Sequence, residues 1–299
     1  MSYRLKPRQP ASQEVQRVAL QRLAKTREAL SLPESRHAEA VHQARKRFKE
    51  LRALLRLVRD PLGKRFAPQN RRLRDAGRAL ADLRDVIALV EGWDALAASD
   101  PERFGTPGLK AVRDRLAARQ PADDEAGGSG EAIERVLAEV AEAGREVAAW
   151  ALRRDGFGLY AAGVERSYRQ GRKALAVVRR DPSDEHLHEW RKRVKDQWYQ
   201  TRLLQAAWPR LFKARIGMLE QLSDWLGDDH DLAMLQALMR DEPELFGDED
   251  TRGGLAPLIA ERRQHLQGRA LRLGRRLYAE SPGALRERWQ RYWKLARTA

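Results

Sequence analysis

The sequence predicts an all-α protein, and three observations support that prediction. Ala, Leu, Arg and Glu dominate the 299 residues and β-branched residues are sparse, a composition that favours helices. Apolar positions recur every three or four residues rather than every two, as in amphipathic helices. Proline-containing segments fall between the periodic stretches, where helices begin or end. We therefore expect helices throughout and no strand.

The proline-containing segments give the expected helix boundaries in order along the chain. Ser31-Leu32-Pro33 and Asp181-Pro182 have the pattern of helix starts, with proline in the first turn. Asp60-Pro61-Leu62-Gly63 and Trp208-Pro209 have the pattern of helix ends. Gly227 is expected to relieve backbone strain at another helix end.

The chain is expected to consist of two similar halves that together form one domain. Residues 121–130 are acidic and then glycine-rich, so we predict a flexible linker there. The segments beginning at His42 and His188 align at an offset of 146 residues, and the same offset places Arg84-Asp85-Val86 over His230-Asp231-Leu232. We therefore expect a duplicated helical bundle, with a first repeat over about 10–120 and a second over about 131–299.

The composition limits the classes of partner. The chain has 58 Lys and Arg against 43 Asp and Glu and a formal charge of +15, which favours anions such as nucleic acid, acidic lipid or polyphosphate. The absence of Cys excludes disulfides and thiolate zinc sites. No signal peptide or membrane-spanning stretch is apparent, so we expect a cytoplasmic protein without a membrane partner.

A basic stripe runs along the predicted helix that contains His42. On a helical wheel at 100° per residue, the stripe collects side chains within about 80° of His42, whereas Phe48, Leu51 and Leu54 lie on the opposite side. Residues 41–59 contain seven Arg or Lys and only one acid, Glu50. The members of the first stripe are His42, Arg45, Lys46, Lys49, Arg52 and Arg56.

A second stripe repeats this arrangement around His188, with Trp190 and Val194 on its apolar side. Its members are His188, Arg191, Lys192, Lys195, Tyr199 and Arg202. A charged stripe is most often a solvated surface, but such surfaces usually mix acids with bases at pairing distance. Because these two stripes carry mainly one sign, we predict a site for an extended anion that contacts several helical turns at once.

The other candidate residues suggest no catalytic or metal centre. The His residues show no Glu-x-x-His or His-x-x-x-His spacing, so we expect neither a metal nor a cofactor. Asp85 and Asp231 are expected to cap a helix or pair with an Arg. No carboxylate has an assignable catalytic partner.

The chain resembles the CHAD family, the conserved histidine α-helical domain, across nearly its whole length. The resemblance rests on His42-x-x-Arg45-Lys46-x-x-Lys49, on the segments 187–195 and 226–232, and on Tyr168-Arg169-Gln170-Gly171-Arg172. It implies two four-helix repeats around a basic central channel that binds inorganic polyphosphate, often at polyphosphate granules. It also implies a binding role for Arg172.

Two further arginines, Arg74 and Arg78, are expected to line the channel from the next helix. Their counterparts at the offset of 146 are the acids Glu220 and Asp224, so the two halves need not grip a ligand equally. The predicted function is non-catalytic polyphosphate binding. General nucleic-acid binding is the runner-up, and an accessory subunit of a polyphosphate- or triphosphate-processing enzyme and a histidine phosphotransfer protein are further alternatives.

Overall fold

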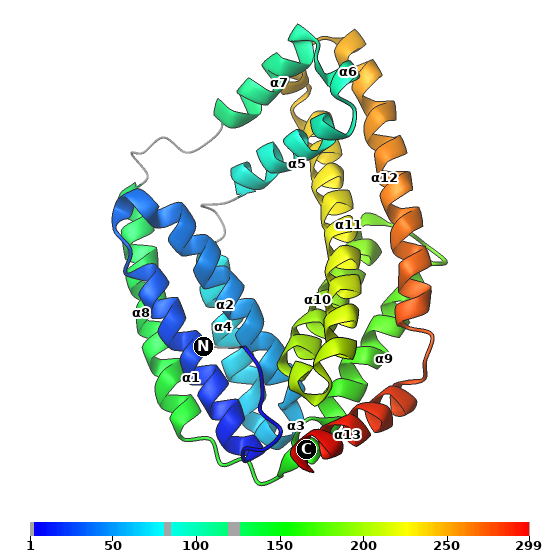
Figure 1. Cartoon of the computed structure of the whole chain (residues 1–299). Helices are drawn as coiled ribbons and strands as arrows, with labels where there is room; N and C mark the ends of the chain where they lie inside the picture. The colour runs from blue at the N-terminus through cyan, green and yellow to red at the C-terminus, as the bar shows by residue number, and fades with distance from the viewer. Residues whose placement is uncertain (1–2, 81–84, 119–125, 299) are drawn as a thin grey trace.

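The computed structural model describes residues 3–80, 85–118 and 126–298, and within these ranges the chain forms helices and contains no strand (Figure 1). The predicted all-α fold class is therefore confirmed. The helices are α1 (Ala11–Leu30), α2 (His37–Leu57), α3 (Arg59–Leu62), α4 (Phe66–Ala79), α5 (Asp85–Ser99), α6 (Pro101–Phe104), α7 (Pro107–Ala118), α8 (Ala126–Ala148), α9 (Ala161–Val178), α10 (Asp184–Leu203), α11 (Pro209–Asp241), α12 (Glu249–Leu277) and α13 (Pro282–Thr298).

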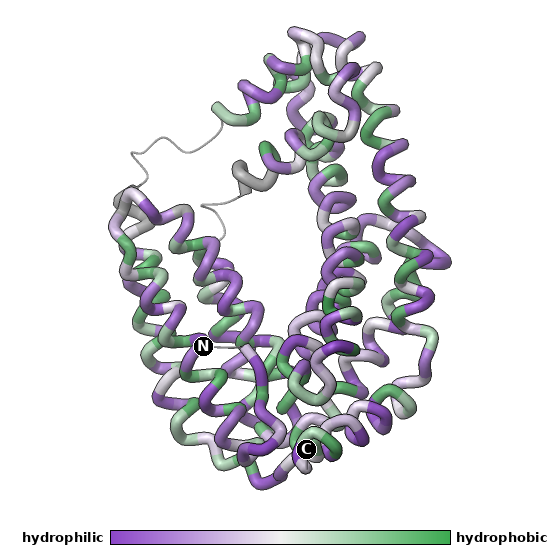
Figure 2. The backbone as a smooth tube through the Cα atoms, viewed as in Figure 1, coloured by the Kyte–Doolittle hydropathy of each residue, from purple (hydrophilic) through white to green (hydrophobic). Residues whose placement is uncertain are grey.

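Most helices carry both hydrophilic and hydrophobic residues along their length (Figure 2). The apolar faces predicted for α2 and α10 lie in the core: Phe48, Leu51 and Leu54 are buried, as are Trp190 and Val194. The hydrophobic effect therefore fixes the rotation of each helix about its own axis, and with it the direction of the basic stripe. In the described ranges, no helix combines the length and the apolar character needed to span a membrane.

Helices α1, α2, α4 and α8 pack together as one group. Helix α1 contacts α2 and α8, and α4 contacts the same two helices. The group lies on one side of the molecule in Figure 1. Most of α8 (Ala126–Ala148) belongs to the predicted second repeat, which begins at about residue 131, yet α8 packs against α1 and α4 of the first repeat.

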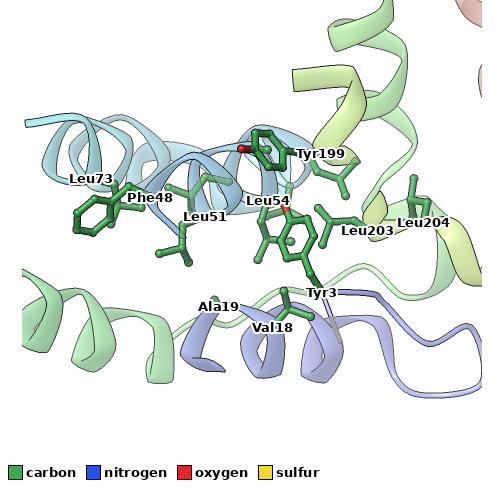
Figure 3. Close-up of a cluster of buried hydrophobic side chains, with 14 of the residues drawn as sticks. Tyr3, Val18, Ala19, Phe48, Leu51, Leu54, Leu73, Tyr199, Leu203 and Leu204 are labelled. Atoms are coloured by element: carbon green, nitrogen blue, oxygen red, sulfur yellow. The ribbon is translucent and has the colours of Figure 1, made fainter. Parts of the chain in front are cut away.

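A continuous hydrophobic core joins this group to α9, α10, α11 and α13. Figure 3 shows part of that core, where Tyr3 lies among side chains from the first and second halves of the chain. The ring of Tyr3 meets that of Tyr199 edge to face, with centroids 6.3 Å apart. The Tyr3 hydroxyl donates a 2.8 Å hydrogen bond to the carbonyl oxygen of Glu50. These contacts fasten α2 to α10.

Helices α5, α6 and α7 pack away from the first group, although they come from the first half of the sequence. Trp93 and Phe104 join Phe246 and Ile259 in a second hydrophobic cluster with α11 and α12. At the α5–α11 contact, a Cβ atom added at Gly92 would stand 3.2 Å from the Cβ atom of Asp231. Three helices from the first half of the chain thus pack against one end of α11 and α12 (Figure 1).

The element order agrees with the sequence offset over the first two long helices. Adding 146 to the bounds of α1 and α2 gives 157–176 and 183–203, which overlap α9 and α10. Beyond these two pairs of helices the pseudo-symmetry of two four-helix repeats stays a prediction. Helix α8 packs with helices of the first repeat, and α5 to α7 pack with helices of the second.

Several local predictions need correction. Trp208-Pro209 begins a helix rather than ending one, because Pro209 occupies the first turn of α11, where its missing N–H costs nothing. Gly227 lies inside α11 and not at a helix end. Of the predicted linker, residues 121–125 lie outside the described residues, and residues 126–130 are helical because they extend the amphipathic helix α8.

Candidate anion-binding site

The N-terminal parts of the two basic stripes, which are far apart in the sequence, line one shared cavity of about 590 Å³, here called the histidine cavity. Burial of the apolar faces of α2 and α10 leaves both stripes on the cavity side. The stripe residues that line it are His42, Arg45, Lys46 and Lys49 from α2 and His188, Arg191, Lys192 and Lys195 from α10, and six of these eight are Arg or Lys. Helical periodicity placed these residues on the stripes, and their role in binding an anion stays a prediction.

The histidine cavity is also lined by acids, although the sequence predicts a basic channel. Glu220, Asp224 and Asp231 from α11 line it together with Glu91 from α5. Trp198, Tyr199, Ser223 and His230 complete the lining. The sequence offset contained a signal for two of the acids, since Glu220 and Asp224 correspond to Arg74 and Arg78.

A second cavity of about 460 Å³, here called the arginine cavity, adjoins the first. The two cavities share five lining residues: Arg45, Lys49, Lys192, Lys195 and Tyr199. The other cations of the arginine cavity are Arg52, Arg56, Arg74, Arg78 and Arg193, and its acids are Glu189 and Asp196. Nine cations against two acids make this cavity the more strongly positive of the two.

The cations of the arginine cavity lie close enough to destabilise one another's charge. Burial, and then the neighbouring Arg56, lower the pKa of Arg52 to about 10, and Arg74 and Arg78 act in the same direction. Asp196 opposes this effect and accepts a 2.8 Å hydrogen bond from Arg56. Asp196 itself is buried, and burial raises its pKa. A bound anion would relieve this repulsion between arginines.

His188 stacks on His230 in the histidine cavity, with ring centroids 4.3 Å apart and an angle of 35° between the planes. The pKa of His188 is lowered to about 4, first by burial and then by the charges of His230 and Lys192. Burial also lowers the pKa of His230. The Nδ1 atom of His188 is buried and has no hydrogen-bond partner among the described residues. Sequence reasoning missed His230 as a site residue, although His230 belongs to the segment 226–232.

Two predicted binding residues do not line either cavity. The Arg172 guanidinium donates a 2.8 Å hydrogen bond to the carbonyl oxygen of Glu280. In the same motif, the Tyr168 hydroxyl donates to the carbonyl oxygen of Leu277 at 3.2 Å. The Tyr-x-x-Gly-Arg segment therefore fastens α9 to the connection between α12 and α13, and the anion-binding role predicted for Arg172 is not supported by its position.

Arg202 also points away from both cavities, into the packed region around Tyr3. Its guanidinium lies 4.7 Å from the centroid of the Trp198 ring and 3.7 Å from an oxygen of the buried Glu50. The stripe on α10 thus ends at Tyr199, because one turn later the same helix face meets the N-terminal segment. Arg202 stabilises the contact between α10 and α2.

The sequence predicts structural roles for Asp85 and Asp231. The side chain of Asp85 lies outside the described residues. Asp231 lines the histidine cavity at the contact with α5. Among the described side chains, no group of three or more His, Asp or Glu is placed to hold a metal ion.

The model of a known protein family matches most of the chain. The model of the CHAD domain family matches residues 14–240. A search of curated proteins returned no match. The matched range includes α2, α4, α10 and nearly all of α11, the four helices that supply most of the two cavities. With the family model covering more than half of its length, this chain belongs to the CHAD domain family.

Proposed function

We propose that this protein binds inorganic polyphosphate in the arginine and histidine cavities and does not catalyse a reaction on it. One observation carries the proposal: cation stripes from α2 and α10, 146 residues apart in the sequence, line a single cavity that continues through shared residues into a second, more basic one. The association of CHAD domains with polyphosphate and triphosphate binding supports this choice of anion.

A linear polyanion suits this site better than a lone phosphate does. Each helical turn advances about 5.4 Å, so cations on successive turns of α2 and α10 meet successive charges of an extended anion. Arg forms bidentate hydrogen bonds to phosphate oxygens, and each charge-assisted bond contributes on the order of 1.5–3 kcal/mol. The environment of Arg52 supports the proposal: burial is the main cause of its lowered pKa, and repulsion from Arg56, Arg74 and Arg78, which a bound anion would offset, adds to it.

The proposed role is binding rather than catalysis. Within the described ranges, the acids of the two cavities form no group arranged to hold a metal ion. His188 and His230 stack on each other among cations, and nothing in that arrangement singles out one imidazole as a phosphoryl acceptor. We further propose that the protein acts in the cytoplasm, at polyphosphate granules.

Competition binding tests the proposal. Long-chain polyphosphate, duplex DNA and RNA are titrated against one another at physiological salt, and phosphate release is monitored in parallel. We expect polyphosphate to bind most tightly and to remain intact. Equal displacement by DNA or RNA would favour the nucleic-acid alternative, and phosphate release would favour an enzyme.

Matched variants locate the binding site. Replacing Arg45, Lys46, Arg191 and Lys192 with Ala removes four positive charges from the histidine cavity. The control replaces four exposed lysines outside both cavities, Lys64, Lys110, Lys213 and Lys294, and changes the net charge equally. We expect at least a hundredfold loss of affinity in the cavity variant alone, since four contacts of about 1.5 kcal/mol would each be lost. Equal losses in both variants would indicate nonspecific attraction.

A further inference from the structure

The two halves of the site differ in charge at matching positions. Arg74 and Arg78 on α4 line the arginine cavity, whereas Glu220 and Asp224, their counterparts at the offset of 146, line the histidine cavity from α11. A bound phosphate chain would therefore have cations on its α4 side in one cavity and carboxylates on its α11 side in the other.

Asp224 also competes for the cations that an anion would use. Asp224, which is largely exposed, lines the histidine cavity together with Lys195 and Arg191. Desolvation raises the pKa of Asp224, and the positive charges of Lys195 and Arg191 oppose that rise. Any phosphate that approaches Lys195 from the histidine cavity meets the field of this carboxylate. Glu220 lies one turn earlier on the same helix and lines the same cavity.

The numbers of charged residues also make the arginine cavity the more positive of the two. The arginine cavity has nine cations against two acids, and the histidine cavity has six cations against four acids. A short phosphate chain is held best where the potential is most positive, in the arginine cavity. A longer chain must continue past the shared Lys192 and Lys195 toward Glu220 and Asp224.

We infer that Glu220 and Asp224 limit how much of a long phosphate chain the site holds. A short chain occupies the arginine cavity, and the part of a longer chain that enters the histidine cavity is bound weakly because of these two carboxylates. Glu220 and Asp224 are thus determinants of chain-length preference. This inference rests on the proposed polyphosphate binding and adds to it two residues that limit the length of chain held.

Calorimetric titration of two ligands tests the inference. Tripolyphosphate and a monodisperse long-chain polyphosphate are each titrated into the wild-type protein and into the E220Q/D224N variant. We expect the variant to bind the long chain about tenfold more tightly, a factor that corresponds to about 1.4 kcal/mol. Its affinity for tripolyphosphate should change by less than about twofold, as for weak electrostatic interactions through solvent.

A matched control separates position from net charge. The E134Q/D114N variant removes the same two charges at exposed positions outside both cavities. An equal gain in this control, an equal gain for both ligands in E220Q/D224N, or no gain for the long chain would each overturn the inference. Wild-type protein that binds neither ligand would instead refute the proposed function. Wild-type binding with an unresponsive E220Q/D224N variant would refute only the role of the two acids.

Discussion

The guanidinium group of Arg191 lies directly against the backbone of Gly227: a Cβ atom at position 227 would stand 3.0 Å from Nη2 of Arg191. The two residues belong to α10 and α11, and the missing side chain lets the cation approach the neighbouring helix. Gly227 therefore sets the position of one cavity arginine although its own backbone is helical.

Gly227→Ala is expected to lower polyphosphate affinity without lowering thermal stability. Alanine favours a helix interior by up to about 1 kcal/mol, and the flexible end of Arg191 is able to move aside, so thermal stability should stay level or rise. Polyphosphate affinity should fall several-fold because Arg191 is displaced. Gly217→Ala is the control on the same helix, since a Cβ atom at that position meets nothing within 4 Å. The prediction fails if the two variants bind equally well.

Arg172→Ala is expected to lower stability without changing polyphosphate affinity. The substitution removes the hydrogen bond to the carbonyl oxygen of Glu280, a loss of about 1–3 kcal/mol. Urea unfolding measures the first effect and calorimetric titration the second. A loss of affinity comparable to that of Arg45→Ala would restore the binding role that the sequence motif implied for Arg172.

Glu50→Gln is expected to destabilise the fold strongly. Glu50 is fully buried and forms ion pairs with Arg22 and Arg47, each at 3.2 Å, and Arg22 is itself buried. Neutralising Glu50 leaves buried positive charge without its partner, at a cost of about 3–5 kcal/mol. Urea unfolding should show this loss.

The control for Glu50 is Glu39→Gln, which removes an exposed ion pair with Arg36 on the surface. Exposed pairs of this kind contribute about 0–1 kcal/mol, so this variant should unfold almost as the wild type does. Similar unfolding midpoints for the Glu50 and Glu39 variants would contradict the prediction that the ion pairs of Glu50 stabilise the fold.

Binding is expected to take up protons at mildly acidic pH. Since the folded pKa of His188, about 4, lies below the ordinary value of 6.5, the unfolded chain binds this proton more readily. The stability of the free protein should therefore fall as the pH drops from about 6.5 toward 4. A phosphate beside the imidazole of His188 raises its pKa, so the bound state takes up a proton more readily than the free protein does. Polyphosphate affinity should therefore rise several-fold as the pH falls from about 8 to 5.5.

Proton uptake is measured by calorimetry in buffers of different ionisation enthalpy. We expect uptake by the wild type and less uptake by His188→Asn, which keeps a neutral polar group at that position. His186→Asn is the control, because His186 interacts with Asp181 outside both cavities. A flat affinity profile between about pH 5.5 and 8 would exclude the proton-coupled role of His188.

Much of the site could be predicted from helical periodicity, because periodicity is a local property. Phe48 and Leu51 must turn inward, so Arg45 and Lys49 must turn the other way. Periodicity also placed Arg202 on its stripe, but it carries no information on what another segment brings to that face. The N-terminal segment around Tyr3 meets Arg202 there and separates it from the cavity.

The helical fold class, the cationic faces of α2 and α10 and the family of the chain could all be read from the sequence. Three features depend on tertiary contacts: α5 packs on α11, Glu220 and Asp224 line the same cavity as Arg191, and Arg172 connects α9 to the segment after α12. The physical reason is the range of the interactions. Hydrophobic periodicity acts within one helix, whereas the sign of the charge opposite a cation depends on packing between residues far apart in the chain.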